Sequence, residues 1–306
     1  YVEMTSYTAM QPLVGSCKLA CEVGQMKRIM TSSWSLHRVL GEAMYDWSDI
    51  CSVPKRSCGG SGMLSLIEVP EELAKRDIGM LEICHFHLPL TEETYLRELR
   101  SELEAQKIDL YSVLIDAGDV AHPDPQQRAT EVAWVRAWLG IAAQLGASHA
   151  RVIAGAAQLA ERGPIEDDPA VCASAESLLE LAQYARPLGV RVSTENFRSL
   201  GCHVGALSAL LDRCEGEVGL CADFGNFKGR RKYADLAAIL PRATSVHAKA
   251  DFSPEGQIDR ADFTRCLELA QEARFTGPYS LIFSSSGDEW EGLARTREVV
   301  DPFIGG

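Results

Sequence analysis

The 306-residue sequence has no apolar run that approaches the roughly 20 residues needed to span a bilayer. Its first 25 residues also lack the basic start and long apolar stretch of a secretory signal. Basic residues are in the minority: 30 Lys and Arg stand against 43 Asp and Glu, and the net charge is −13. Because an acidic surface repels phosphate backbones, we expect no nucleic-acid partner and no membrane partner. A cytoplasmic location follows from the same observations.

The ten cysteines lack the paired spacing of a zinc ribbon. In a chain of this size, scattered cysteines are typical of reduced thiols in the cytosol. Cys84 and Cys221 lie inside apolar strand-like runs, where a thiol behaves as a small hydrophobic side chain. Metal binding or oxidation is the alternative for the cysteines near the amino terminus, but no further ligand pattern supports it.

Strand-like apolar runs alternate with amphipathic helical stretches from Met26 onward. This alternation predicts a parallel sheet with helices outside it, and eight such units fit a single closed (β/α)8 TIM barrel over residues 26–306. An open doubly wound sheet is the alternative, disfavoured because no Gly-x-Gly-x-x-Gly follows the first strand. The predicted strands lie near 27–33, 80–88, 109–116, 148–154, 190–196, 218–224, 244–249 and 278–283.

Helical periodicity is clearest over 91–107, 125–145 and 169–188. A Gly precedes several of the strands, and this pattern predicts left-handed helix caps at Gly79, Gly146, Gly189 and Gly277. Residues 1–25 lack periodicity, so we expect a poorly ordered or non-native extension there. The first strand–helix connection, 33–80, is unusually long and is interpreted either as a lid or as a mobile insertion.

Three ligand-type residues mark the carboxyl ends of successive predicted strands: Glu195, Asp223 and His247. Because the strands of a barrel present these ends to one shared site, we expect the three side chains to converge. Two carboxylates and an imidazole form a donor set that suits a divalent cation. We therefore predict a metal centre for Mn²⁺ or Mg²⁺, with Zn²⁺ or Co²⁺ as alternatives.

Further polar side chains follow the strand ends. Period-two alternation places His247 and Lys249 on one face of their strand, and His85 and His87 on one face of theirs. Lys249 is expected to be an electrophile or a partner for a substrate phosphate, unless it pairs with a neighbouring Asp. Histidines at these depths are otherwise buried, hydrogen-bonded residues. The substrate contacts that we predict are Trp34, His85, His87, Asn196, Arg198 and Asn226.

Five segments carry a family resemblance: Ser32-Ser-Trp-Ser-Leu-His37, Leu81-Glu-Ile-Cys-His85, Thr194-Glu-Asn196, Asp223-Phe-Gly-Asn226 and Val246-His-Ala-Lys249. In order and spacing they resemble the xylose isomerase-like TIM barrel superfamily. That superfamily includes sugar phosphate isomerases and epimerases, ketose 3-epimerases, inosose dehydratases and endonuclease IV-type enzymes. The resemblance implies that Glu195, Asp223 and His247 bind metal, that the substrate is small and polyhydroxylated, and that the chain forms a homo-oligomer.

Two positions depart from the family pattern. Asn226 stands where many relatives have a second histidine, and Phe283 stands where many have a strand-eight carboxylate that serves as ligand and second base. The fourth metal ligand must then be water or another side chain. Candidates in the sequence are His85, Asp288 and Glu289.

The resemblance implies an isomerase that abstracts a proton α to a carbonyl, with Glu195 as the base and a metal-stabilised enediolate. A 3-epimerase needs acids and bases on both faces of the substrate, so the missing carboxylate favours isomerisation or elimination. Three alternatives remain open: a dehydratase or lyase acting on a keto-sugar or keto-inositol, an endonuclease IV-like phosphodiesterase, and a non-catalytic sugar-binding barrel.

Overall fold

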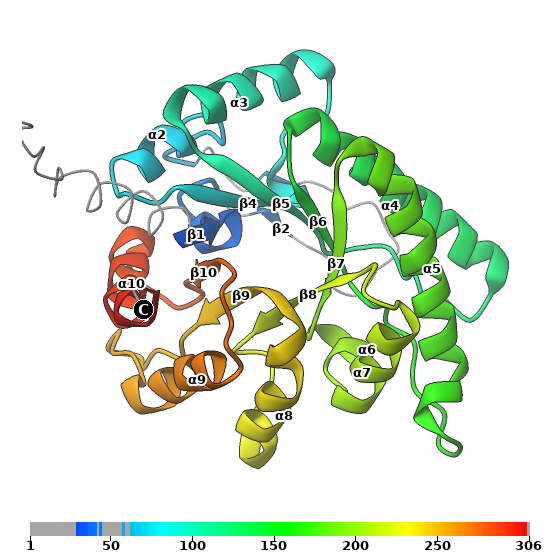
Figure 1. Cartoon of the computed structure of the whole chain (residues 1–306). Coiled ribbons are helices and arrows are strands. Elements are labelled where there is room, and N and C mark those ends of the chain that lie inside the picture. The colour runs from blue at the N-terminus through cyan, green and yellow to red at the C-terminus, as the bar shows by residue number, and fades with distance from the viewer. Residues whose placement is uncertain (1–28, 42, 45–56, 59–61, 305–306) are drawn as a thin grey trace, which may run out of the picture.

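The computed structural model describes residues 29–41, 43–44, 57–58 and 62–304. Eight parallel strands close into a barrel with helices around it, which confirms the predicted TIM barrel (Figure 1). The predicted extension over residues 1–25 lies outside the described residues. Around the barrel the strands follow the order β1 (Ile29–Ser32), β10 (Tyr279–Ile282), β9 (Ala243–Lys249), β8 (Gly219–Asp223), β7 (Arg191–Glu195), β6 (His149–Val152), β5 (Asp109–Ile115) and β4 (Met80–Cys84).

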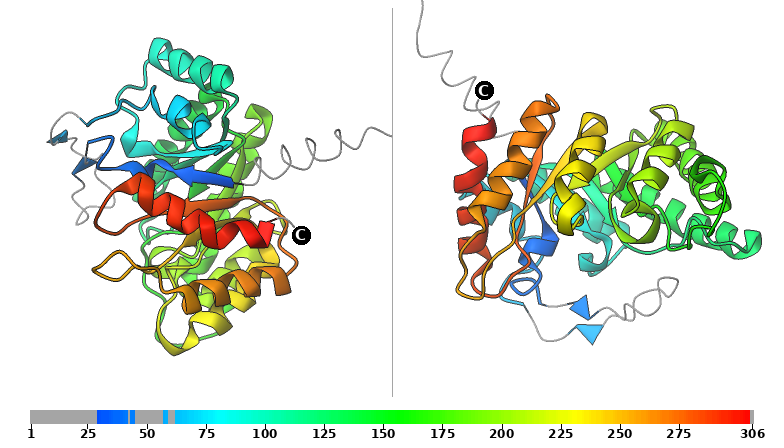
Figure 2. Two further views of the ribbon diagram at one scale, coloured as in Figure 1. Left: turned by 90° about the vertical axis from the view of Figure 1, so that its left-hand side faces the viewer. Right: turned by 90° about the horizontal axis from the view of Figure 1, so that it is seen from below.

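Helices form an outer layer around the strands (Figures 1 and 2). Apolar side chains from helices and strands fill the space between the two layers, so the main core is a ring outside the barrel. None of the described helices is long and apolar enough to cross a membrane. The helices are α2 (Val69–Ala74), α3 (Glu93–Gln106), α4 (Pro125–Leu145), α5 (Pro169–Ala185), α6 (Arg198–Gly201), α7 (Val204–Arg213), α8 (Lys232–Ile239), α9 (Arg260–Glu272) and α10 (Glu289–Ile304).

Local sequence sets the helix boundaries. At the start of α4, the Asp124 side chain accepts hydrogen bonds from the backbone N–H groups of Gln126 and Gln127, and Pro125 occupies the first helical position. The helix ends at Gly146, whose φ of 80° is left-handed. The predicted span 125–145 is therefore confirmed at both ends.

The prediction of glycine caps is correct at only two of four positions. Gly146 and Gly189 are left-handed, but Gly79 and Gly277 are not. Asp77 and Arg274 take the left-handed conformation in those two connections, with φ of 53° and 56°. Gly277 is needed for space instead, because a Cβ atom there would lie 2.5 Å from the carbonyl oxygen of Thr244.

The first strand–helix connection contains β2 (Ala43–Met44) and β3 (Ser57–Cys58), which pair antiparallel. Residues 42, 45–56 and 59–61 of this connection lie outside the described residues, so its interpretation as a lid or an insertion stays a prediction. The carboxyl ends of all eight barrel strands lie on one face of the molecule, which is where active sites of this fold are built.

Candidate metal centre and active site

A cavity of about 370 Å³ opens at the carboxyl ends of the barrel strands. It is lined by residues from all eight barrel strands and from the loops that follow some of them, so residues far apart in sequence meet there. Most of the predicted site residues line this cavity: Trp34, Glu195, Arg198, Asp223, Asn226, His247 and Lys249.

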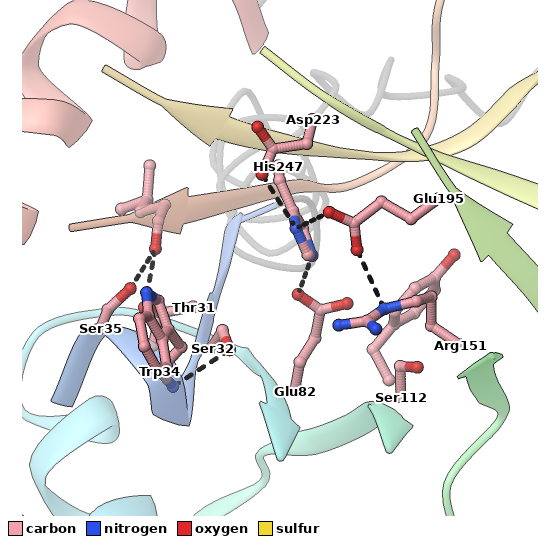
Figure 3. A network of polar contacts seen from close by, with 12 residues as sticks. Thr31, Ser32, Trp34, Ser35, Glu82, Ser112, Arg151, Glu195, Asp223 and His247 are labelled. Atoms are coloured by element: carbon pink, nitrogen blue, oxygen red, sulfur yellow. Dashed lines mark hydrogen bonds and ion pairs between the residues drawn. The ribbon is translucent and has the colours of Figure 1, made fainter. Parts of the chain in front are cut away.

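The imidazole of His247 is surrounded by carboxylates (Figure 3). Its Nδ1 atom lies 3.6 Å from Oε1 of Glu195 and 3.6 Å from Oδ2 of Asp223. On the other side of the ring, Nε2 lies 3.0 Å from Oε2 of Glu82, a residue of β4 that is only 1% exposed. The three predicted ligands therefore converge, with Glu82 as an additional partner.

The charge around His247 controls its protonation. Burial by itself lowers the pKa of this imidazole, but its acidic neighbours, the carboxylates of Glu82 and Glu195 among them, raise it well above the ordinary value of 6.5. With no cation present, the ring is therefore an imidazolium that pairs with the acids on both sides. A divalent cation that replaces the proton on Nδ1 would satisfy the same carboxylates.

The donors around Nδ1 of His247 suit a divalent cation in chemistry, and their distances from Nδ1 can be compared with those of a metal site. Metal–nitrogen and metal–oxygen bonds of about 2.0–2.2 Å at angles of about 90–110° separate neighbouring ligand atoms by roughly 2.8–3.6 Å. The two distances from Nδ1 of His247 are at the upper end of this range. Glu82 can accept the Nε2–H, which leaves the lone pair on Nδ1 for the cation, as is usual for ligating histidines.

Cys221 is a donor that sequence reasoning missed. Among the described residues, the ligand atoms of Glu195, Cys221 and His247 all lie within 4.8 Å of one another, and Asp223 is not in that set. Burial raises the pKa of Cys221, so the group is a thiol when no cation is bound. The signal was present in the sequence, because Cys221 is two residues before Asp223 and period two places both on one face.

A buried ion-pair network holds the Glu195 carboxylate from its other side. Its Oε2 lies 2.9 Å from Nε of Arg151, and Arg151 also pairs with Asp116. The amide of Asn226 donates to Oε1 at 2.9 Å. Arg151 stays charged, and its pKa is raised because the two acids outweigh the effect of burial. The carboxylate is thus fixed in orientation by one cation and one amide.

Backbone and amide groups position Asp223. Its Oδ1 accepts a hydrogen bond of 2.6 Å from the backbone N–H of Gly225. Burial by itself raises the pKa of Asp223, but His247 and Lys249 lower it, and the net pKa is below the ordinary value. Asn196 does not line the cavity: its side chain donates to the backbone carbonyl of Asp223 at 2.9 Å and accepts from its N–H at 2.6 Å.

A family model described as a xylose isomerase-like TIM barrel matches residues 70–300. The chain belongs to this family. No curated protein matches the chain. The solved structures that resemble it include a D-psicose 3-epimerase determined in the presence of D-fructose, with 13% identity and a TM-score of 0.64 over 91% of this chain and 100% of that one.

Two further solved structures are similar. One is a xylose isomerase-like TIM barrel protein from Mycobacterium smegmatis in complex with magnesium, at 17% identity and a TM-score of 0.58 over 80% of this chain and 92% of that one. The other is the 3-keto-D-glucoside 4-epimerase of E. coli, at 12% identity and a TM-score of 0.59 over 89% and 98%. At these identities the likeness shows the shared fold, and the activity has to be argued from the site.

The end of β10 confirms that this xylose isomerase-like barrel lacks a carboxylate there, but the residue that faces the cavity is Ile282. Phe283, which the sequence pointed to, faces away and packs on α10, where a Cβ atom on Gly292 would lie 2.3 Å from its ring. The alternation of a strand explains the difference, because consecutive side chains point to opposite faces.

The two histidines after β4 do not line the cavity. Residues His85–His87 form a 3-10 turn, so the period-two prediction that they share a face is wrong. The ring of His85 packs edge-on against Trp134 and Trp138 of α4, and its Nδ1 accepts the backbone N–H of Asp116 at 3.2 Å. His87 lies 2.8 Å from the hydroxyl of Ser33. A direct role for either in substrate binding remains a prediction.

The other candidates for a fourth ligand are also engaged elsewhere. The Glu289 carboxylate accepts the backbone N–H groups of Arg38 and Val39 at 3.1 and 3.0 Å. Asp288 accepts the backbone N–H of Glu291 at 2.8 Å, at the start of α10. Neither lines the cavity. Cys221 or water is left to complete the donor set.

Proposed function

We propose that this chain is a metal-dependent sugar isomerase that moves a proton α to a carbonyl in a small polyhydroxylated substrate. The observation that carries the proposal is the position of His247, with Nδ1 at 3.6 Å from two carboxylates and Nε2 oriented by Glu82. Membership of the xylose isomerase-like barrel family and the sugar epimerases among its structural neighbours support the same substrate class.

Glu195, Asp223 and His247 would hold the cation, with Cys221 as a further donor. A bound divalent cation would act as a Lewis acid toward neighbouring carbonyl and hydroxyl oxygens of the substrate and stabilise negative charge that develops there. Mn²⁺ and Mg²⁺ suit the carboxylates, whereas a thiolate would favour Zn²⁺ or Co²⁺.

Glu195 is the group that we assign as the base. Its carboxylate lines the cavity, and Arg151 and Asn226 fix its orientation, which reduces the reorganisation needed when it takes the proton. The proton moves from the substrate carbon to a Glu195 oxygen and returns to the adjacent carbon, while the hydroxyl proton passes from one substrate oxygen to the other. Base and acid at carbon are therefore the same side chain. Lys249, also in the cavity lining, is placed to stabilise charge on substrate oxygen.

The wall of the cavity at the end of β10 favours chemistry on one face of the substrate. Where the family pattern has a second carboxylate, Ile282 presents an apolar side chain that cannot transfer a proton. Single-face proton transfer serves an aldose–ketose isomerase, whereas 3-epimerisation needs a second acid or base. The same observation favours elimination of water from a keto-sugar as the second candidate function, because that reaction also begins with one base.

Hydrogen–deuterium exchange tests the proposal directly. The protein loaded with Mn²⁺ is incubated in D₂O with a panel of aldoses and ketoses, and deuterium incorporation at the carbon next to the carbonyl is followed by mass spectrometry. We expect Glu195→Gln to lower incorporation by about 10²–10⁴-fold. Glu98→Gln, at an exposed position on α3, is the matched control and should leave the rate unchanged.

The outcomes separate the competing functions. Incorporation that survives Glu195→Gln removes this residue as the base. Loss of water from the substrate during exchange identifies the lyase. A chain that binds cation and sugar but exchanges no proton is a sugar-binding barrel, and cleavage of abasic DNA would identify the phosphodiesterase, which the net charge of −13 disfavours.

A further inference from the structure

A second cavity lies at the face of the barrel opposite the active site. Its volume is about 1030 Å³, against about 370 Å³ for the active-site cavity. Its lining comes from the amino-terminal parts of β5 to β9 and from the connections that lead into β7, β8, β9 and β10. This face of a TIM barrel usually contributes to stability and not to binding, so a cavity of ligand size here calls for its own explanation.

Two stacked rings belong to the lining of this second cavity. The rings of Tyr111 on β5 and His149 on β6 lie 4.3 Å apart between centroids, with an angle of 24° between their planes. Tyr111 is buried, and its hydroxyl donates to the backbone carbonyl of Thr244 on β9 at 3.4 Å. The His149 ring is half-buried. The pair gives the cavity an aromatic surface onto which a flat ligand ring can stack.

Hydrogen bonds determine which nitrogen of His149 carries the proton. The Ser148 hydroxyl donates to the backbone carbonyl of Tyr111 at 3.0 Å. Because its proton is used there, the same hydroxyl accepts from Nδ1–H of His149 at 2.8 Å. Burial and the Arg191 guanidinium lower the pKa of this imidazole to about 4, against the opposing effect of Glu82. The ring is therefore neutral at pH 7, and its Nε2 is a hydrogen-bond acceptor.

The charged residues of the lining give the second cavity a positive charge. Three cations stand there with one acid, and the neutral His149 adds nothing, so the described lining carries an excess of two positive charges. These residues are Arg186, Arg191, Arg274 and Glu217. Glu217 pairs with Arg186, so Arg191 and Arg274 supply the excess. The whole chain has a net charge of −13, and a concave site of the opposite sign concentrates anions locally.

We propose that this cavity is a second binding site, for a small molecule that joins an anionic group to a planar ring with an N–H donor. The anion accepts charge-assisted hydrogen bonds from Arg191 and Arg274. The ring stacks on the pair formed by Tyr111 and His149, and its N–H donates to Nε2 of the histidine. The two cavities share no lining residue in the described part of the chain, so the inference does not depend on the proposed function.

Calorimetry on the full chain tests the site with four probes, in buffer with EDTA so that no metal is bound. Adenosine 5′-monophosphate joins a phosphate to a base with an amino group, and indole-3-acetate joins a carboxylate to an indole N–H. Adenosine and inorganic phosphate each supply one half of the first probe. We expect at least one of the two anionic rings to bind about tenfold or more tightly than adenosine and phosphate. The tighter of the two identifies the anion as phosphate or carboxylate.

Three variants separate the parts of the site. Arg191→Met removes a cation from an exposed position at the start of β7, and Arg274→Gly removes the other at a residue whose φ of 56° suits glycine. Each should weaken the tighter anionic probe by about tenfold or more and change adenosine binding by less than about threefold. His149→Phe keeps a ring beside Tyr111 but lacks Nε2, so it should weaken the anionic probe and adenosine alike, by about three- to tenfold.

Two control variants locate the bound anion. Lys249→Met removes a cation from the active-site cavity, and Arg97→Met removes one from the exposed side of α3. Neither should change the affinity for the anionic probes. A loss in Lys249→Met as large as that in Arg191→Met would place the anion in the active site and overturn the inference. Equal affinities for all four probes, or no binding of either anionic ring, would also overturn it.

The titrations contain no metal and no sugar, so they are independent of the exchange assay. If no sugar exchanges a proton but the anionic ring binds as described, the proposed function fails and the second site stands. If exchange depends on Glu195 but neither anionic ring binds, the second site fails and the proposed function stands.

Discussion

The Glu82 carboxylate lies 3.0 Å from Nε2 of His247, while Glu195 and Asp223 face Nδ1 of the same ring. Glu82 comes from β4 and His247 from β9, which are on different sides of the barrel. The imidazole therefore joins an acid from one side of the barrel to two acids from the other. With Nε2–H directed to Glu82, Nδ1 is the atom left to bind a cation.

Removing this orienting acid should weaken metal binding without unfolding the protein. Glu82→Gln keeps the shape of the side chain but no longer fixes the proton on Nε2. We expect the affinity for Mn²⁺ to fall by about 10–100-fold, measured by calorimetry. Glu131→Gln is the control, since Glu131 is also a buried glutamate but is held by Gln127 on α4. Unchanged affinity in Glu82→Gln would show that Glu82 does not orient the ligand.

Breaking the buried ion pairs of Arg151 should destabilise the fold. Arg151→Met leaves the carboxylates of Asp116 and Glu195 buried without their cation, and we expect the free energy of unfolding to fall by about 3–5 kcal/mol in urea with EDTA present. Arg136→Met removes a surface pair with Glu180 and should cost less than about 1 kcal/mol. A loss of similar size in both variants would contradict the burial argument.

Restoring an acid at the end of β10 tests which side chain faces the cavity. Ile282→Glu should add a ligand and tighten Mn²⁺ binding by about tenfold, which adds about 1.4 kcal/mol to the stabilisation by saturating Mn²⁺. Phe283→Glu should instead disrupt packing against Gly292, cost at least about 3 kcal/mol, and leave metal affinity unimproved. Thermal unfolding with and without Mn²⁺ measures both. The opposite pattern would reverse the assignment of the two faces.

Acid should destabilise the protein between about pH 6.5 and 4. Burial lowers the pKa of His85 to about 4 from an ordinary value of 6.5. In this window the unfolded chain binds a proton that the folded chain does not, so stability falls as the pH is lowered. For His85 the contribution is on the order of 3 kcal/mol.

The pH effect is measured by urea unfolding at pH 7 and pH 4.5. His85→Phe, which keeps a ring between Trp134 and Trp138, should be less stable at pH 7 but lose less stability on acidification. His122→Gln, at a half-buried loop position, should lose as much free energy of unfolding between pH 7 and pH 4.5 as the wild type does. If His85→Phe loses as much free energy of unfolding on acidification as the wild type, the acid sensitivity comes from other residues.

The sequence was sufficient to predict the barrel and to bring Glu195, Asp223 and His247 together at neighbouring strand ends, because both depend on local patterns. The bounds of α4 are set by the cap residues Asp124 and Gly146 and by Pro125 at the first helical position. The approximate strand ends follow from the apolar runs. The inward or outward direction of single side chains was harder to predict. His85 leaves the strand pattern because the chain turns into a 3-10 helix, and Phe283 is displaced from the cavity by one residue of register. Periodicity cannot locate the residue at which a strand stops.

The ion-pair partners were also beyond the sequence. Arg151, Asp116 and Glu82 were visible as polar residues near strand ends, but their pairing with Glu195 and His247 depends on the order and stagger of strands in the closed barrel. The irregular register between Leu81 and Glu82 is one such feature. Cys221 was read as a hydrophobic side chain because its neighbours along the chain are apolar, although its neighbours in space are acidic and basic.

The side-chain amide of Asn196 makes two hydrogen bonds to the main chain of Asp223 and so links the carboxyl ends of the adjacent strands β7 and β8. The two acids carried by those ends are therefore spaced by main-chain atoms more than by the freedom of their own side chains. A site whose two carboxylates are held at a fixed spacing selects cations by radius. Removing the hydrogen bonds of Asn196 should therefore reduce the selectivity between small and large cations, even though Asn196 contacts neither.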